Sequence, residues 1–368
     1  MSYPQLTASR LDLAATCPGS FAHEHTHTTN SAAERGTAVH EYIAGLLENE
    51  WAPLPADEQA AKLCRDLNEQ EYMEAARPRH SAMLYTEQAL YLLPTTGEAG
   101  LLESDHHRDY SRAPEGSIPG TADALAVEED GVVVTDWKTG ARESSRPADN
   151  HQLRFLGLAA ARFFGMNQAV VQIGKVGDAG SLELHSATLD GEELDCIEGE
   201  LKKIARQLRS AREDEPVYRT GQHCRFCPAI ANCPAIAGTA QAILDGPPEE
   251  LTPATAADLW SKLQAVEAAA KRTRESLMEY VYARPIPTSA GKQLKVVETR
   301  RETIDSSIAF RVLRGYLPNE ALAEAVSVTK SSLSGALDKE MQGEVLAILR
   351  GQDAVSESYS ESLREVRG

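Results

Sequence analysis

Residues 118–138 read IPGTADALAVEEDGVVVTDWK, and this stretch predicts the centre of the fold. The segments 118–127 and 132–138 have the apolar character of strands, and the second begins with three consecutive valines. Between them, the Glu-Asp-Gly sequence at 129–131 supplies residues that tight turns favour. The stretch therefore predicts a β-hairpin within a buried sheet.

Three polar residues of this hairpin form a candidate catalytic set. Asp136 and Lys138 lie two positions apart on one strand, so their side chains share a face of the sheet. Asp123 lies on the neighbouring strand, where pairing across the turn can bring its carboxylate beside Asp136. Two carboxylates could hold Mg2+ or Mn2+, and the Lys138 ammonium could position water or stabilise negative charge. For the Asp-Trp-Lys triplet alone, a salt bridge at a strand end is the structural alternative.

Three residues outside the hairpin are further candidates for the same site. His40 lies in a helix predicted over about 36–47, where its imidazole could supply a third ligand; a surface or core histidine is the alternative. Glu87, on a strand predicted over 84–93, is either an acidic partner or an exposed strand residue. Gln152, at the start of a predicted helix, either orients the substrate or the lysine, or caps the helix.

Four cysteines form a second candidate site. One lies near the start of the chain, and the other three follow more than two hundred residues later. Cys17 follows a short predicted helix, and Cys224, Cys227 and Cys233 have the spacing C-x2-C-x5-C. Thiolates at this spacing can reach one metal or cluster, and four soft ligands suit an iron–sulfur cluster or Zn2+. Such a centre would join the N-terminal region to a distant segment. Disulfide pairing is the alternative.

The elements around the hairpin predict an α/β fold in which helices flank a mixed sheet. Further strands are expected over 84–93, 168–176 and 181–189, and helices over about 150–164 and 190–212. The breaker-rich Gly246-Pro-Pro-Glu-Glu predicts a boundary between residues 1–245 and a mainly helical region, 246–368. Cys64 and Cys196 lie alone in helical segments, and we expect both to be buried as small apolar residues.

Composition limits the class of protein. The 368 residues are 42% hydrophobic without any long apolar run, so we expect no transmembrane helix. The first residues lack the apolar run of a secretory signal, which predicts a cytoplasmic protein, where clustered cysteines are more often ligands than disulfides. A net charge of −18 argues against non-specific DNA binding over the whole surface. Residues 261–301, however, hold nine Lys or Arg and four Glu, which form either a local basic track or a solvated helix face.

The order of these motifs resembles that of RecB-like PD-(D/E)XK nucleases. The resemblance is to their iron–sulfur branch, which includes the CRISPR-associated exonucleases, AddB-type nuclease domains and phage-encoded stand-alone relatives. It covers residues 5 to about 237 and rests on Cys17, Arg-Gly-Thr-Ala-Val-His40, Gly-Thr-Ala-Asp123, Asp136-Trp-Lys138-Thr-Gly, Gln152-Leu and the C-x2-C-x5-C end.

The resemblance implies a PD-(D/E)XK restriction-endonuclease-like core with a mainly helical C-terminal addition. It implies that His40, Asp123 and Asp136 bind the catalytic metal, helped by the backbone carbonyl of Trp137, and that Lys138 is the catalytic lysine. Mg2+ or Mn2+ is the expected metal.

The resemblance also assigns Gln152 to a substrate-side motif and a [4Fe-4S] cluster to the four cysteines, Cys17, Cys224, Cys227 and Cys233. Members of the family often have a tyrosine three or four residues beyond the glutamine. This chain has Phe155 and Leu156 there, which puts the substrate contact of that tyrosine in doubt.

The resulting prediction is a metal-dependent DNA nuclease, an exonuclease that acts on DNA ends or single strands in phage or bacterial recombination or repair. Its partners would be single-stranded DNA or duplex ends, with a phage recombinase or single-strand-binding protein as a candidate and no membrane. The sequence lacks a Walker-type motif, so the nuclease would have no motor of its own. The alternatives are a catalytically inactive DNA-binding or assembly subunit that keeps the fold and cluster, and a zinc-stapled or redox-sensing protein.

Overall fold

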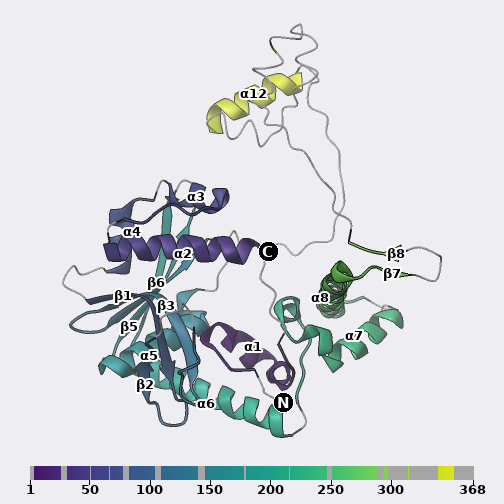
Figure 1. The fold of residues 1–368 in the computed structure, drawn as a ribbon, viewed down its shortest axis with the longest axis horizontal. Helices are drawn as coiled ribbons and strands as arrows, with labels where there is room; N and C mark the ends of the chain where they lie inside the picture. The colour runs from purple at the N-terminus through teal and green to yellow at the C-terminus, as the bar shows by residue number, and fades with distance from the viewer. Residues whose placement is uncertain are drawn as a thin grey trace. The chain divides into compact units, whose positions relative to one another are not determined.

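The computed structural model describes most of the first 300 residues and a short part of the C-terminal region (Figure 1). The described residues are 4–25, 31–49, 51–65, 67–77, 83–103, 109–139, 146–177, 180–214, 216–246, 251–287, 293–296, 314 and 339–351. The chain divides into two compact units, Met1–Lys295 and Val296–Gly368. The first unit holds the sheet and all of the candidate site residues.

A six-stranded sheet with the order β2-β1-β3-β4-β5-β6 forms the centre of the first unit. The strands are β1 (Met83–Leu92), β2 (Ala99–Leu101), β3 (Ile118–Val127), β4 (Val132–Lys138), β5 (Ala169–Val176) and β6 (Leu182–Leu189). All neighbours are antiparallel except β4 and β5, which are parallel and joined by the helix α5 (His151–Phe164). A parallel pair needs such a crossover because a tight turn cannot connect its ends. The predicted hairpin and the mixed α/β sheet are confirmed.

Helices cover both faces of the sheet (Figure 1). One face packs against α2 (Ser31–Asn49), α3 (Glu58–Cys64) and α4 (Glu69–Ala76). At its centre the ring of Trp137 lies 5.3 Å from that of Tyr72. The opposite face packs against α1 (Leu11–Thr16), α5 and α6 (Gly191–Glu213). Each large apolar side chain that is fully buried in these layers contributes about 1.5–3 kcal/mol, so the two cores hold the strands firmly.

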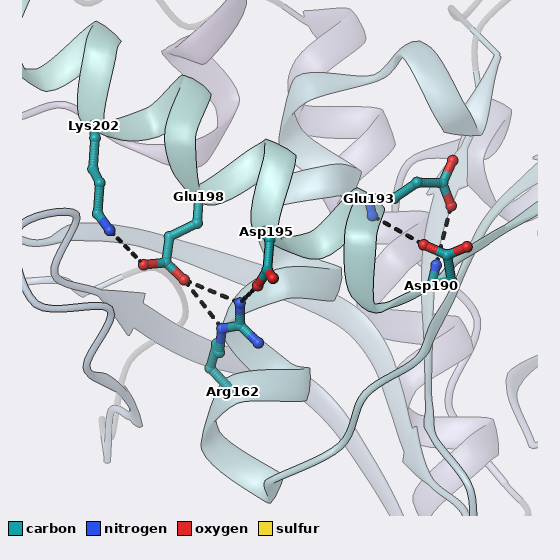
Figure 2. A network of polar contacts seen from close by, with 6 residues as sticks. All are labelled: Arg162, Asp190, Glu193, Asp195, Glu198 and Lys202. Atoms are coloured by element: carbon teal, nitrogen blue, oxygen red, sulfur yellow. Dashed lines mark hydrogen bonds and ion pairs between the residues drawn. The ribbon is translucent and has the colours of Figure 1, made fainter.

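The ends of α5 and α6 are determined by local sequence. The Asn150 side chain accepts a hydrogen bond from the N–H of Leu153, which caps α5, and Gly165 ends the helix with φ 69°, a left-handed conformation that glycine adopts without strain. Asp190 and Glu193 form a capping box at the start of α6, with reciprocal bonds of 2.9 and 3.0 Å (Figure 2). Both helices begin and end close to the predicted residues.

Ion pairs link α5 to α6 (Figure 2). The Arg162 guanidinium lies 2.5 Å from Asp195 and 3.1 Å from Glu198, and Lys202 lies 2.7 Å from Glu198. Partly exposed pairs contribute only about 0.2–1 kcal/mol each, so they add little to the apolar packing between the two helices.

The cysteine segment comes after α6 and is covered by two helices that pack on each other, α7 (Pro234–Leu244) and α8 (Pro253–Ala283). The 3-10 helices η5 (Gln222–Phe226) and η6 (Ile230–Asn232) carry or adjoin the three C-terminal cysteines. The N-terminal region has η1 (Ala8–Arg10) and η2 (Pro18–Ala22) around α1, and η3 (Pro147–Asp149) precedes α5. The remaining described elements are β7 (Ile286–Pro287), β8 (Gln293–Leu294) and, in the second unit, α12 (Lys339–Gly351).

The structure departs from the expectations at a few places. Cys196 is exposed, so its predicted burial was wrong. The reason is that α6 buries the face with Leu194, Ile197 and Leu201, and position 196 lies on another face. Cys64 is buried as predicted. The short strand β2 and the helix α7 had no counterpart in the prediction. The domain boundary at residues 245 and 246 stays a prediction, and most of the residues beyond 296, for which the prediction was mainly helical, lie outside the described residues. Within the described ranges, none of the helices combines the length and the apolar character needed to cross a bilayer.

Candidate metal centre and cysteine cluster

The strands β3 and β4 separate at the two acidic residues of the hairpin. Their antiparallel register ends with the pair Ala124 and Thr135, so Asp123 and Asp136 are the next residues on the two strands. Beyond this point β3 pairs with β1, and β4 pairs with β5. The Asp123 Oδ2 atom accepts a hydrogen bond from the N–H of Trp137 at 2.7 Å, where a strand carbonyl would otherwise accept it. We call this separation of β3 and β4 the fork. It brings the carboxyl groups of Asp123 and Asp136 to one point of the sheet.

A helix and the neighbouring strand bring two more polar groups to Asp123. His40, in the middle of α2, places its Nδ1 atom 3.4 Å from Asp123 Oδ2. Glu87 of β1 lies opposite Asp123, at the position that the strand pairing skips between the pairs Thr86–Ala124 and Gln88–Ala122. One ligand atom from each of His40, Glu87 and Asp123 lies within 4.8 Å of the other two. An imidazole and two carboxylates at this spacing could hold one divalent cation.

The backbone of Glu87 is strained. Its φ of 44° is the one positive value at a non-glycine residue in the part of the chain that the structure describes. A left-handed conformation costs such a residue about 1–2 kcal/mol. It also interrupts the alternation of side chains between the two faces of the sheet. Tyr85 before it and Leu90 after it are five positions apart and would face opposite sides of a regular strand, yet both contact the same core. Strain of this kind concentrates at functional sites, where surrounding packing maintains it.

Burial and charge oppose each other at these groups. Asp123 is only 5% exposed, and burial alone would raise its pKa, but His40 and smaller effects outweigh burial and hold the pKa below its ordinary value. Burial raises the pKa of Asp136 and outweighs the opposite effect of Lys138. Burial lowers the pKa of His40, but the carboxylates, with Asp123 first, raise it above its ordinary value. Burial thus favours the neutral form of Asp136, and positive charge beside the group favours its ionised form.

Lys138 and Gln152 supply polar contacts to Asp136. The Lys138 Nζ atom lies 2.6 Å from Asp136 Oδ2, and Gln152 Nε2 donates to Asp136 Oδ1 at 3.3 Å. Asp136 is 6% exposed, whereas Lys138 is 37% exposed and so reaches toward solvent. The ammonium group thus joins a buried carboxylate to the surface, where an anionic group could approach it.

The residues present fit a hard divalent cation. The Nδ1 atom of His40 is buried and pairs with Asp123 Oδ2 at 3.4 Å, which is longer than an ordinary hydrogen bond. In the neutral imidazole, the lone pair of a ring nitrogen can bind a cation. Carboxylate oxygens beside it are the donors that Mg2+ and Mn2+ prefer.

The structure brings the predicted residues into two adjoining groups. His40 and Asp123 form one with Glu87, and Asp136, Lys138 and Gln152 form the other. The side chain of Trp137 is buried on the other side of β4, where a Cβ atom on Gly174 would lie 2.3 Å from its ring. Glu87, like His40 and Gln152, was left with two interpretations by the sequence. Its position opposite Asp123 in the strand register, which only the structure shows, places it in the first group.

The four predicted cysteines also lie near one another. All four are free, Cys17, Cys224 and Cys227 are buried, and Cys233 is partly buried. Burial raises the pKa of Cys227 to about 12, and the charges of the other three cysteines add to the effect. Among the described residues, no three of these sulfur atoms come within 4.8 Å of one another.

A groove of about 870 Å³ lies between the cysteine segment and α8. Its lining includes Phe226 and both signs of charge, from Arg225, Lys271 and Arg272 and from Glu267, Glu275 and Glu279. Phe226 is 56% exposed, and the Arg225 guanidinium lies 5.4 Å from the centre of its ring. Lys271 and Arg272 both lie near Glu275, at 3.9 and 3.2 Å, so part of the positive charge predicted for this stretch is neutralised.

Comparisons with known proteins give one family and distant structural neighbours. The sequence profile of the family described as "Protein of unknown function (DUF2800)" matches residues 4–350. No curated protein matches. A solved structure titled "Crystal structure of SSO0001" shares 14% identity over 64% of this chain and 88% of its own, with a TM-score of 0.29. An alkaline exonuclease (LHK-Exo) from Laribacter hongkongensis shares 12% identity over 57% of this chain and 90% of its own, with a TM-score of 0.27. At these low TM-scores the site has to be interpreted from its own geometry.

Proposed function

The chain belongs to the DUF2800 family, whose members are described as proteins of unknown function, and we propose that it is a metal-dependent deoxyribonuclease of the RecB-like PD-(D/E)XK type. The observation that carries the proposal is the fork between β3 and β4. There the carboxylates of Asp123 and Asp136 meet beside His40 and Glu87, with the partly exposed Lys138 next to them.

In this proposal, His40, Glu87 and Asp123 bind one Mg2+ or Mn2+ ion, with Asp136 and the carbonyl of Trp137 as further ligands. The N–H of Trp137 points to Asp123, and the N–H and C=O of one strand residue point to the same side, so this carbonyl faces the same space. When bound, the cation would polarise the phosphodiester and lower the pKa of a water molecule.

Lys138 and Gln152 act on the substrate side. The ammonium of Lys138, held 2.6 Å from Asp136, stabilises the negative charge that develops on the phosphate during hydrolysis. Gln152 holds the other oxygen of Asp136 by its 3.3 Å hydrogen bond, which keeps the carboxylate oriented toward the lysine. Neither role needs the tyrosine that the RecB-like nucleases often have after this glutamine. The residues at the corresponding positions, Phe155 and Leu156, are fully buried in the core.

The proposed substrate is DNA, as ends or single strands, in phage or bacterial recombination or repair. The exposed ring of Phe226, with the Arg225 guanidinium 5.4 Å from its centre, supports this choice because an aromatic ring beside a cation suits a base and its phosphate. A catalytically inactive subunit is the second candidate. The intact set of two carboxylates, a histidine and a lysine favours an enzyme over that candidate.

We further propose that Cys17, Cys224, Cys227 and Cys233 hold a [4Fe-4S] cluster. Four free thiols gathered from two ends of the unit supply the donor set. The same four thiolates could instead hold a single zinc ion, and analysis of bound iron, sulfide and zinc in anaerobically purified protein distinguishes the two.

The test of the nuclease proposal is cleavage of single-stranded and duplex DNA, labelled at either end, with Mg2+, Mn2+ or EDTA. Wild type should degrade DNA only with the metal, and Lys138→Ala should lose about 100-fold or more of the activity. Lys262→Ala, which removes a lysine that pairs with Asp258 on α8, is the matched control and should keep it. Full metal-dependent cleavage by Lys138→Ala would refute this site. A wild-type protein that binds DNA without cutting it would establish the inactive subunit.

A further inference from the structure

The segment that carries Cys17 is joined to residues 217–221 by contacts that involve no sulfur atom. The N–H of Gly19 donates to the carbonyl of Val217 at 3.0 Å. The Arg219 guanidinium donates to the carbonyl of Thr16 at 3.2 Å. These bonds bridge about two hundred residues of sequence, so residues 217–221 return the chain to its N-terminal region just before the three C-terminal cysteines.

Two aromatic rings strengthen this connection. The rings of His23 and Tyr218 stack with their centres 5.6 Å apart, and His23 Nε2 lies 2.7 Å from the Tyr218 hydroxyl oxygen. Gly19 lies beneath Tyr218, where an added Cβ atom would be 2.7 Å from both the ring and the Val217 carbonyl oxygen. Such distances are too short for any side chain, so glycine at position 19 is what permits the close approach.

The same segment reaches two of the sulfur atoms. The N–H of Arg219 donates to Cys17 Sγ at 3.4 Å, and the N–H of Gly221 donates to Cys224 Sγ at 3.4 Å. Hydrogen bonds from backbone donors stabilise a thiolate over a thiol, and the thiolate is the form that binds a metal. Residues 217–221 therefore hold one sulfur from each end of the cysteine set.

We propose that residues 217–221 form a clasp that holds Cys17 beside the three C-terminal cysteines before any metal centre is bound. Gly19, His23 and Tyr218 are its positioning residues. The inference rests on the proposed cysteine-bound centre and is independent of the nuclease proposal. Its consequence is that the entropy of closing the long loop is already offset by protein contacts. The centre can then be lost and rebuilt without unfolding of the two segments.

Hydrogen exchange on metal-free wild type tests the clasp directly. The protein is reduced, stripped with a chelator, and followed by mass spectrometry of peptides that cover residues 16–24 and 216–222. We expect both peptides to stay protected in the stripped protein, since the bonds of Gly19, Arg219 and Gly221 need no metal. Exchange in both peptides as fast as in the unfolded chain would overturn the proposal.

Two glycine-to-alanine variants test whether Gly19 positions the cysteines for metal binding. Stripped Gly19→Ala and Gly199→Ala are titrated with Co2+ alone, and the thiolate-to-cobalt absorbance is measured. Gly199 in α6 has nothing within 4 Å of an added Cβ atom, so its variant should match wild type. Gly19→Ala should bind Co2+ at least about 10-fold more weakly than wild type, and its thiolate-to-cobalt absorbance should be lower because fewer thiolates bind the ion. Equal binding by the two variants would overturn the role of Gly19.

If Gly19→Ala fails to fold, Tyr218→Phe takes its place, because it keeps the ring and removes only the hydroxyl that contacts His23. It should weaken Co2+ binding in the same direction, and wild-type affinity would overturn the role of the Tyr218–His23 contact. Neither measurement reads DNA cleavage. The nuclease proposal can therefore fail while the clasp stands, and the reverse also holds.

Discussion

Trp137 donates its main-chain N–H to the carboxylate of Asp123 at 2.7 Å, across the point where β3 and β4 separate. The indole of Trp137 is buried on the opposite face from Asp136 and Lys138, because successive strand residues alternate. Its ring packs so closely on Gly174 that no larger residue fits there. One buried residue thus binds the carboxylate of Asp123 through its backbone and lies in the strand between Asp136 and Lys138 of the candidate site.

The two carboxylates at the fork should be essential for cleavage. We expect Asp123→Asn and Asp136→Asn each to lower metal-dependent DNA hydrolysis by about 100-fold or more, because each loses a charge that binds the cation. Asp258→Asn on α8 is the control and should be active. Circular dichroism and melting temperature check the fold. Near-normal cleavage by a folded Asp123→Asn protein would contradict the proposed metal site.

Glu87 should contribute to metal binding although it lies on a different strand from the two aspartates. Glu87→Gln removes the negative charge of one of the three groups whose ligand atoms lie within 4.8 Å of one another. Mn2+ affinity should therefore fall by about 10-fold, measured by calorimetry or by the Mn2+ requirement of cleavage. Glu183→Gln changes an exposed acid on the edge strand β6 and should leave the affinity unchanged. If the two variants bind Mn2+ equally, Glu87 is not a ligand.

The contact between His151 and Asp12 should make stability depend on pH. His151 Nδ1 lies 2.5 Å from Asp12, and this hydrogen bond is the main reason why the pKa of His151 lies above its ordinary value. A raised folded-state pKa stabilises the protein below the unfolded value of about 6.5, and the stabilisation is lost as pH rises through the folded value.

The His151→Gln variant measures this effect. Because Asp12 is 69% exposed, the difference in unfolding free energy from wild type should be below about 1 kcal/mol. It should be largest near pH 6 and shrink toward pH 9 in a series of thermal or urea denaturations. His185→Gln, on the exposed edge strand, is the comparison. A difference that grows with pH would mean that the assignment is wrong.

Each of the four clustered cysteines should be needed for the metal centre. Replacing Cys17, Cys224, Cys227 or Cys233 by Ser should remove visible absorbance and bound iron and sulfide from anaerobically purified protein. Cys196→Ser, at the exposed thiol of α6, should change neither. Cys64→Ser should reduce stability because Cys64 is buried, but it should keep the iron. Stoichiometric zinc without iron or sulfide would replace the cluster with a zinc site.

The groove beside α8 should contribute to DNA binding. Replacing Arg225 and Lys271 by Ala should weaken binding of a labelled oligothymidine and reduce the log–log salt slope by about 0.7 for each phosphate that is no longer neutralised. Phe226→Ala should weaken binding without changing the slope, because stacking carries no charge. Arg274, an exposed residue on the same helix that does not line the groove, supplies the control variant. Unchanged affinity in all three groove variants would leave this face without a role in DNA binding.

Local patterns predict most of the sheet and the chemistry of the two sites. The Val132–Lys138 run, the cap at Asn150 and Gly165 each specify their element, because strand burial, helix capping and a left-handed turn depend on a few adjacent residues. Residue type likewise predicts which side chains could bind which class of metal, since carboxylates and an imidazole suit hard cations and thiolates suit soft metals. The C-x2-C spacing is local in the same way.

Relationships between distant residues depend on the tertiary structure. Glu87 joins the site only because β1 pairs with β3 in one particular register, and a shift of one residue would turn its side chain away. Cys196 is exposed only because α6 turns another face to the sheet. Gly19 meets Tyr218 across about two hundred residues because α6 returns the chain to η2. Packing of the two cores selects these contacts, and packing energy depends on the whole set of neighbours, which no short stretch of sequence contains.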